Sequence, residues 1–279
     1  MWLLAAIMTT VCFGTNNAIF KWSTGKGYSK VNIQFFFYFS AFLLTLAYGV
    51  ISDSLDLHLL TVVLGAIIGV LNTNGNIQMS KAFEKGPASL TSPIISANAI
   101  FPVLSAGLIF HEEISTLQWS GILLMLVSAV VIQYMPSQLK VQTQYSSWIF
   151  RIILAVLSFG VLGVLMKLTS YLHISSLNIL ISMYGGGSLY LLIMRLSRKE
   201  KTRVPEVKLG ATVGIISVAG FSCYFFALKT GIASIVFPVV SLNCLIVVLA
   251  GYFLFKEKLR IYQIFGVVTA LLGIVLTKI

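Results

Sequence analysis

Long apolar segments follow one another along almost the whole sequence, and they restrict the fold more than any other feature. Each has about 20 residues, the length that an α-helix needs to cross the hydrocarbon core of a bilayer. A transmembrane β-barrel would instead show strands of about ten residues with alternating polarity. Only 10% of the residues are charged, against about 25% in a soluble domain. The sequence therefore predicts an all-α membrane protein. The ten predicted transmembrane helices cover residues 1–20, 31–51, 59–81, 87–110, 115–134, 148–168, 174–196, 207–228, 232–255 and 260–278.

The second half of the sequence repeats the first. A shift of 145 residues pairs Gly65 with Gly210, Gly69 with Gly214, Pro93 with Pro238, Asn98 with Asn243, Glu112 with Glu257 and Gln118 with Gln263. A shift of 146 pairs Phe13-Gly14 with Phe159-Gly160 and Lys21 with Lys167. Residues 1–134 and 148–279 therefore form two repeats of five spans each, with 135–147 as a linker. Because five is odd, the second repeat enters the membrane from the opposite side, which predicts two inverted repeats around a central cavity.

Most of the 19 lysines and arginines lie in the connections at one end of the predicted spans. The net charge of +11 is also found in nucleic-acid-binding proteins, but basic residues between apolar segments are explained by their effect on membrane orientation. No nucleic-acid partner is expected. The positive-inside rule places these basic connections in the cytoplasm and both termini outside the cell membrane. The expected partners are the lipid bilayer and a small-molecule metabolite, and the chain is expected to be a monomer or a homodimer.

Several short motifs recur in order in both halves. The first half has Phe13-Gly14-Thr15-Asn16-Asn17 and the stretch from Ala82 through Lys85-Gly86-Pro87 to Pro93, and the second half repeats this stretch from Ala227 to Pro238. Acidic turns follow, Glu112-Glu113 and Lys256-Glu257-Lys258. With these motifs the sequence resembles a ten-helix member of the drug/metabolite transporter superfamily, built from two EamA-type repeats. The resemblance covers nearly the whole chain and implies a basket of ten helices around a cavity that moves small organic metabolites.

The third span contains the densest group of polar residues, from Asn72 to Gln78. Polar groups at membrane depth are costly unless they pair or face a cavity, so they are functional candidates. Asn72 and Asn76 share one helical face, with Thr73 beside them. Carboxamides donate and accept hydrogen bonds and would suit a neutral ligand rich in hydroxyl or amide groups. The alternative is that these residues only join neighbouring helices by hydrogen bonds.

The fourth and ninth spans carry the same pattern, Pro93-x-x-Ser96-x-Asn98 and Pro238-x-x-Ser241-x-Asn243. A proline within a helix frees a backbone carbonyl and kinks the helix, which is tolerated where a cavity or a neighbour satisfies that carbonyl. Asn98 and Asn243 are expected either to face each other across the binding site or to stabilise the kink of their own helix. Ser96 and Ser241 are candidate ligand-binding residues on the same grounds.

Three further residues complete the predicted substrate site: Asn16 and Asn17, which interrupt the first span, and Tyr224 in the eighth. Lys21 and Lys167 lie at helix ends, where they either extend to the membrane interface or bind an anion. The middle of the predicted spans holds no Asp or Glu, which disfavours proton-coupled export of cations.

We expect no catalytic residue, metal or cofactor, because the sequence shows neither a pair of carboxylates at membrane depth nor the spacing of metal ligands. The chain is therefore not expected to be an enzyme. The predicted function is a secondary transporter or facilitator that moves a small polar organic metabolite across the cell membrane by alternating access. The alternative is a translocase that moves a lipid or its head group through a laterally open cavity.

Overall fold

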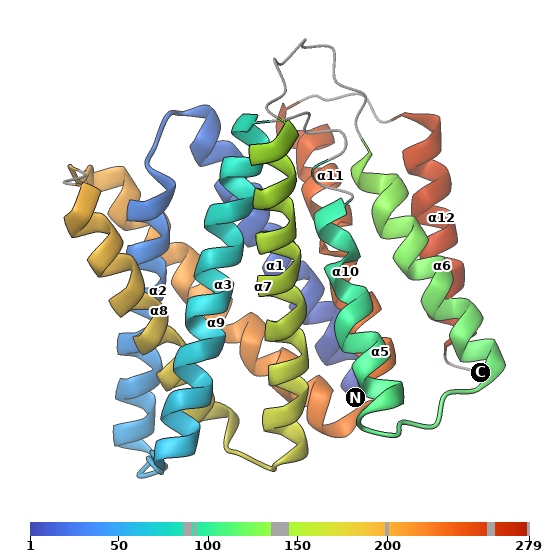
Figure 1. Ribbon diagram of the computed structural model, residues 1–279, viewed down its shortest axis with the longest axis horizontal. Coiled ribbons are helices and arrows are strands. Elements are labelled where there is room, and N and C mark those ends of the chain that lie inside the picture. Colours follow the sequence, from blue (N-terminus) through green and yellow to red (C-terminus); the bar gives the residue numbers. More distant parts are fainter. Residues whose placement is uncertain (86–90, 92–93, 135–144, 199–200, 256–259, 278–279) are drawn as a thin grey trace.

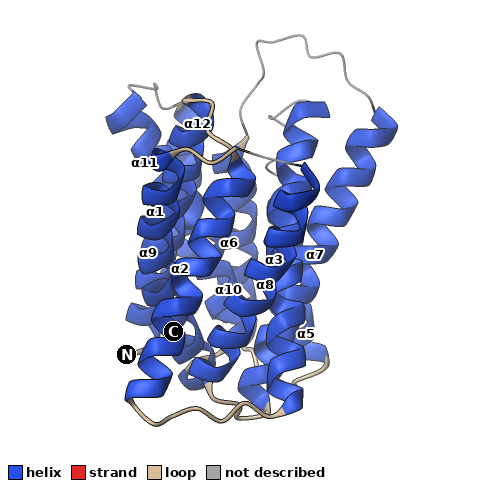
Figure 2. Cartoon of the chain, turned by 90° about the vertical axis from the view of Figure 1, so that its left-hand side faces the viewer, coloured by secondary structure: helices blue, strands red, loops and turns tan. Residues whose placement is uncertain are grey.

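The computed structural model describes residues 1–85, 91, 94–134, 145–198, 201–255 and 260–277, and all the regular structure within them is helical. The helices run side by side between two ends of the molecule (Figures 1 and 2). Within this part of the chain eight helices have the length and apolar character of membrane spans, and two are shorter, Ile94–Leu108 and Ile261–Leu276. The elements are α1 (Trp2–Gly25), α2 (Lys30–Ile51), α3 (Leu59–Lys85), η1 (Ala97–Ala99), α5 (Ile100–Leu108), α6 (Thr116–Gln133), α7 (Tyr145–Tyr171), α8 (Ser176–Arg198), α9 (Val204–Thr230), α10 (Ala233–Ser241), α11 (Asn243–Phe255) and α12 (Ile261–Leu276).

The predicted all-α membrane fold is confirmed, with two differences in detail. The ninth span is not one helix, because α10 ends at Ser241 and α11 begins at Asn243. The fourth span is interrupted at the equivalent place by η1. Pro238 lies inside α10, four residues before the break, whereas Pro93 lies outside the described residues. The other predicted spans are present as helices, and α7 begins three residues inside the predicted linker.

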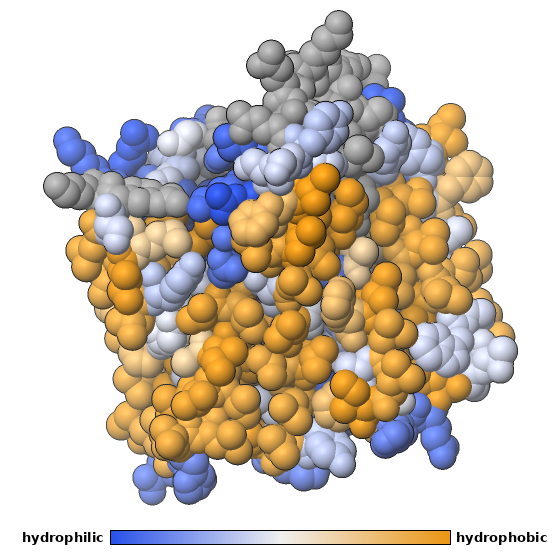
Figure 3. Space-filling view, in the orientation of Figure 1, coloured by the Kyte–Doolittle hydropathy of each residue, from blue (hydrophilic) through white to orange (hydrophobic). Residues whose placement is uncertain are grey.

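The two ends of the bundle differ in charge and in the chain segments that they hold. The basic end contains residues 26–29 and 201–203, and the opposite end, here called the terminal end, contains 52–58, 109–115 and 172–175. α1 begins and α12 ends at the terminal end (Figure 1). An apolar band covers the surface between hydrophilic ends (Figure 3), which is the distribution that a bilayer requires. Which end faces the cytoplasm stays a prediction of the sequence.

Gln118 and Gln263, which are equivalent in the two repeats, lie in the first turns of the equivalent helices α6 and α12. Gln118 and Ser115 form a capping box at the start of α6, since each side chain accepts the other residue's backbone N–H, at 3.2 and 3.1 Å. Gln263 accepts the backbone N–H of Arg260 at 3.0 Å at the start of α12. These bonds satisfy N–H groups that have no partner within the helix.

The paired glycines hold the two repeats together through close contacts between helix backbones. A Cβ atom built on Gly69 in α3 would lie 2.0 Å from the carbonyl oxygen of Met183 in α8. One built on Gly214 in α9 would lie 2.9 Å from the carbonyl oxygen of Phe37 in α2. Phe37 and Met183 are themselves 146 residues apart, so the two contacts are equivalent. The small-xxx-small pattern at 65/69 and 210/214 therefore packs a helix of each repeat against a helix of the other.

We expect Gly69→Ala to destabilise the protein by about 1–3 kcal/mol, the usual cost of overpacking a tight interface. Gly107→Ala in α5 is the matched control, because its Cβ would have no neighbour closer than 3.9 Å. Thermal unfolding in detergent measures both variants. An equal melting temperature for the two variants would show that α3 and α8 can move apart without loss of stability, which would contradict the importance of this close contact.

Candidate functional site

A central cavity of about 280 Å³ lies between the two repeats, near the lower limit of volumes typical for small-molecule sites. Both repeats contribute to its wall, and the described residues that line it include no Asp, Glu, Lys, Arg or His. Its polar side chains are Asn16, Asn17, Asn72, Asn76, Ser96, Asn98, Gln133, Ser217, Tyr224, Ser241 and Asn243. Its apolar part consists of Phe13, Phe20, Phe37, Met79, Ile95, Ala99, Pro102, Phe159, Leu162, Gly163, Phe221, Phe237 and Val240.

Of the ten residues that the sequence predicts for the site, the fold brings nine to this cavity. The exception is Thr73, whose side chain is fully buried. Its hydroxyl donates to the carbonyl oxygens of Gly69 and Val70 in its own helix, at 3.0 and 2.9 Å. Thr73 therefore lies outside the lining of this cavity, because its direction around α3 differs from that of Asn72 and Asn76.

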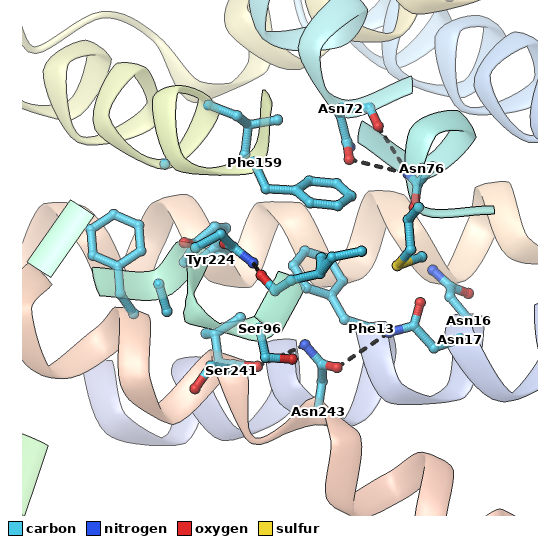
Figure 4. A pocket seen from close by; sticks show the side chains of 18 of the residues that line it. Phe13, Asn16, Asn17, Asn72, Asn76, Ser96, Phe159, Tyr224, Ser241 and Asn243 are labelled. Carbon is cyan, nitrogen blue, oxygen red and sulfur yellow. Dashed lines mark hydrogen bonds between the residues drawn. The ribbon is translucent and has the colours of Figure 1, made fainter. Parts of the chain in front are cut away.

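The polar group of α3 divides between two roles. Asn72 and Asn76 face the cavity, where Asn76 Nδ2 donates to the backbone carbonyl of Asn72 at 3.0 Å (Figure 4). Asn74 and Gln78 are outside the cavity lining and hydrogen-bond each other at 3.0 Å. They also join α3 to α7: Asn74 donates to Ser158 at 3.0 Å and Gln78 accepts from Arg151 at 2.8 Å. The alternative explanation by helix–helix hydrogen bonding therefore holds for Asn74 and Gln78.

Aromatic rings form much of the apolar wall, and the sequence alone gave no reason to select them. Phe13 packs on Phe221 with ring centroids 4.6 Å apart and meets Tyr224 edge-on at 5.9 Å. Tyr224 in turn meets Phe237 edge-on at 6.0 Å. These rings come from α1, α9 and α10, and an aromatic residue in an apolar span carries no signal that distinguishes a cavity wall from a lipid-facing surface.

Asn98 and Asn243 both line the cavity, and each also bonds within the helix break of its own repeat. Asn98 Nδ2 donates to the carbonyl of Ile95 at 2.6 Å, and Asn243 Nδ2 donates to the carbonyl of Val240 at 2.9 Å. Each carbonyl lies three residues earlier, at equivalent positions of the two repeats. The side chains thus replace backbone hydrogen bonds that the breaks remove.

Asn16 and Asn17 in α1 differ in their hydrogen bonding. Asn17 Nδ2 donates to Asn243 Oδ1 at 3.2 Å, which joins α1 to the break in the other repeat (Figure 4). Asn16 is 6% exposed, and its Oδ1 has no hydrogen-bond partner among the described residues. A buried acceptor without a donor is unfavourable by about 1–3 kcal/mol.

The cavity extends along the bundle towards both of its ends. Phe20, close to the end of α1, and Gln133, the last residue of α6, both line it near the basic end. Towards the terminal end the lining reaches Gly163 in α7, Tyr224 in α9 and Phe237 in α10, and Lys167 follows Gly163 one helical turn later. A second pocket lies at that end, lined by Lys167, Ser170, Tyr171, His173, Leu228 and Lys229.

Glu112, in the connection between α5 and α6, joins three elements at that end. One oxygen, Oε1, lies 2.6 Å from Lys167 Nζ and accepts the backbone N–H of Ala233 at 3.0 Å. The other accepts the backbone N–H and the hydroxyl of Ser234, at 2.9 and 2.7 Å. The carboxylate thus caps α10, where the helix dipole favours negative charge.

Both charges of this pair are largely buried, with side chains 12% and 14% exposed for Lys167 and Glu112. Burial alone would raise the pKa of Glu112, but the hydrogen bonds from Lys167 and Ser234 outweigh it and hold that pKa below its ordinary value. Neither prediction for Lys167, extension to the interface or anion binding, describes this ion pair. Lys167 serves to connect the repeats.

The helical fold, the inverted halves and the shared cavity define a multi-pass membrane protein of the repeat type found in transporters. The sequence profile of the EamA-like transporter family matches residues 1–134 and 146–279. The chain therefore belongs to the EamA-like transporter family, as its resemblance to two EamA repeats predicted. This is a family of membrane transporters of small substrates, in agreement with the expectation that the chain is not an enzyme.

The fold recurs in solved structures. One, described only as the crystal structure of a protein, superposes with a TM-score of 0.81 over 98% of this chain and 94% of its own. At 11% sequence identity this likeness is one of fold alone. A search of curated proteins gave no match.

Proposed function

We propose that the chain is a secondary transporter or facilitator that moves a small polar organic metabolite across the cell membrane by alternating access. The observation that carries this proposal is the cavity between the two inverted repeats, lined by carboxamide and hydroxyl groups. Such groups both donate and accept hydrogen bonds, so they suit a neutral solute with several hydroxyl or amide groups. The aromatic rings of the wall add apolar contact for the carbon skeleton of that solute.

The position of the cavity supports an alternating mechanism. The lining extends towards the basic end, while the Glu112–Lys167 pair and the start of α10 lie on the way to the terminal end. Opening of the terminal end would require these contacts between the repeats to separate. The repeats would then close around the solute at the basic end, as inverted-repeat transporters do when they rock around a fixed site.

A ligand screen by thermal unfolding tests the proposal. The protein purified in detergent is heated with sugars, polyols, amides and amino acids, and uptake of each stabilising compound is then measured in proteoliposomes. A ligand at about 100 times its Kd is expected to stabilise the fold by roughly 2.7 kcal/mol. Uptake of a stabilising solute that saturates and is competed by unlabelled solute supports transport.

A lipid substrate is the outcome that would contradict this proposal. In that case no soluble compound stabilises the protein or enters the vesicles, whereas a phospholipid with a labelled head group moves between leaflets faster with the protein than without it. The same vesicles serve both measurements, so the two functions are compared at equal protein content.

A further inference from the structure

The two repeats are not equivalent at the cavity wall, and one of the differences concerns the hydrogen bond between Asn17 and Asn243. The close contacts of α1 and α7 are otherwise matched. A Cβ on Gly14 would lie 2.4 Å from Ile246 Cβ, and one on Gly160 would lie 2.8 Å from Phe101 Cγ. Gly160 is 146 residues after Gly14, and Ile246 is 145 after Phe101. α1 therefore packs on α11 as α7 packs on the segment formed by η1 and α5.

Within this matched packing, Asn17 of α1 corresponds to Gly163 of α7, and Asn243 corresponds to Asn98. Asn17 donates to Asn243 Oδ1 at 3.2 Å. Gly163 has no side chain with which to make the equivalent bond to Asn98. Both Gly163 and Asn98 line the central cavity, so the difference between the repeats is located at the proposed site.

The orientation of the Asn98 carboxamide is set by its partner. Its Nδ2 donates to the carbonyl of Ile95 at 2.6 Å, as Nδ2 of Asn243 donates to Val240. A backbone carbonyl can only accept a hydrogen bond, so the Asn98 side-chain atom that contacts the Ile95 carbonyl must be the amide nitrogen Nδ2. The remaining polar atom of the carboxamide is the acceptor Oδ1. Among the described residues no group donates to Asn98 Oδ1, whereas Asn243 Oδ1 receives Asn17.

We propose that Asn98 Oδ1 is the acceptor that selects the solute, and that a hydroxyl or amide N–H of a neutral solute takes the place that the Asn17 carboxamide holds in the other repeat. This inference rests on the proposed transport function and adds to it the position and polarity of one contact. Gly163 lines the cavity and has no side chain that could make this hydrogen bond in place of the solute.

Transport in proteoliposomes of D-glucose, glycerol, L-serine and L-glutamine tests the inference, each beside analogues with one hydroxyl or amide N–H methylated. For a transported solute, methylation of the donor that reaches Asn98 is expected to lower uptake about tenfold in the wild type, the effect of leaving one buried acceptor without its donor. In Asn98→Ala the solute and that analogue are expected to differ less than about twofold. A merely structural role of Asn98 would lower uptake of both by the same factor, and this result would overturn the inference.

Gly163→Asn and Gly163→Ala give a second, independent measurement. Both add a Cβ that would lie 2.9 Å from Pro102 Cγ, so the overlap with Pro102 at that atom is common to the two variants. Only asparagine adds a carboxamide donor, and its uptake is expected to be at least about tenfold lower than that of the alanine variant. Equal uptake by the two variants would overturn the inference. If the wild type moves none of the four solutes while the lipid assay is positive, the proposed function fails and this inference fails with it.

Discussion

Replacement of Asn72 and Asn76 by leucine is expected to abolish solute uptake in proteoliposomes while the protein still folds. The two carboxamides line the cavity and belong to its polar wall. Leucine has a similar size but neither donates nor accepts hydrogen bonds, so a polar solute would have to leave water without replacement partners. Two lost contacts at about 1–3 kcal/mol each correspond to a fall in apparent affinity of roughly 30-fold to 10,000-fold.

Thr73→Val is the matched control for this experiment. Thr73 lies on the same helix between the two asparagines, but its hydroxyl bonds only to Gly69 and Val70 of α3. Uptake by this variant is expected to equal that of the wild type. Retained uptake in the double leucine variant, together with a lower melting temperature, would assign Asn72 and Asn76 to helix packing instead of the solute site.

Glu112→Gln is expected to lower the free energy of unfolding by about 3–5 kcal/mol, because it leaves the largely buried Lys167 charge without its partner. The double variant Glu112→Gln/Lys167→Met removes both charges and is expected to recover most of this loss. Thermal unfolding in detergent at pH 7 compares the three proteins. A double variant as unstable as the single one would mean that the ion pair is not the source of the effect.

The same pair predicts how stability depends on pH. The pKa of Glu112 is lower in the folded protein than its ordinary value of 4.5. The folded state therefore gains stability from the ionised carboxylate at every pH above the ordinary value, and it loses this gain as the pH falls through the lowered pKa. Between pH 7 and pH 3 the wild type is expected to lose more stability than Glu112→Gln. Parallel curves for the two proteins would contradict the cause assigned to the pKa shift.

The candidate site could be predicted in large part because asparagine and serine are costly at membrane depth. That cost draws attention to Asn16, Asn17, Asn72 and Asn76, whichever helices surround them. The cost does not say towards which neighbour a residue points, and for this reason it could not separate Thr73, which lies outside the cavity lining, from Asn72 and Asn76. The aromatic wall had no such signal, since a phenylalanine such as Phe13 or Phe237 can pack against lipid, protein or ligand.

The sequence by itself determined the membrane fold, the count of ten spans and the two repeats of five. Segment length, hydropathy and the spacing of repeated glycines can be read from the sequence directly. The bilayer requires apolar segments of this length to form membrane-spanning helices. Only the tertiary structure decided which repeated residues meet. Gly69 and Gly214 bring each repeat against the other, and Gly14 lets α1 approach α11, where Asn17 and Asn243, which are 226 residues apart, form a hydrogen bond. Contacts of this kind depend on side-chain direction around packed helices. Several equivalent lining positions also differ between the repeats, among them Asn17 and Gly163, Asn72 and Ser217, and Asn76 and Phe221, so the two halves of the cavity are unlike.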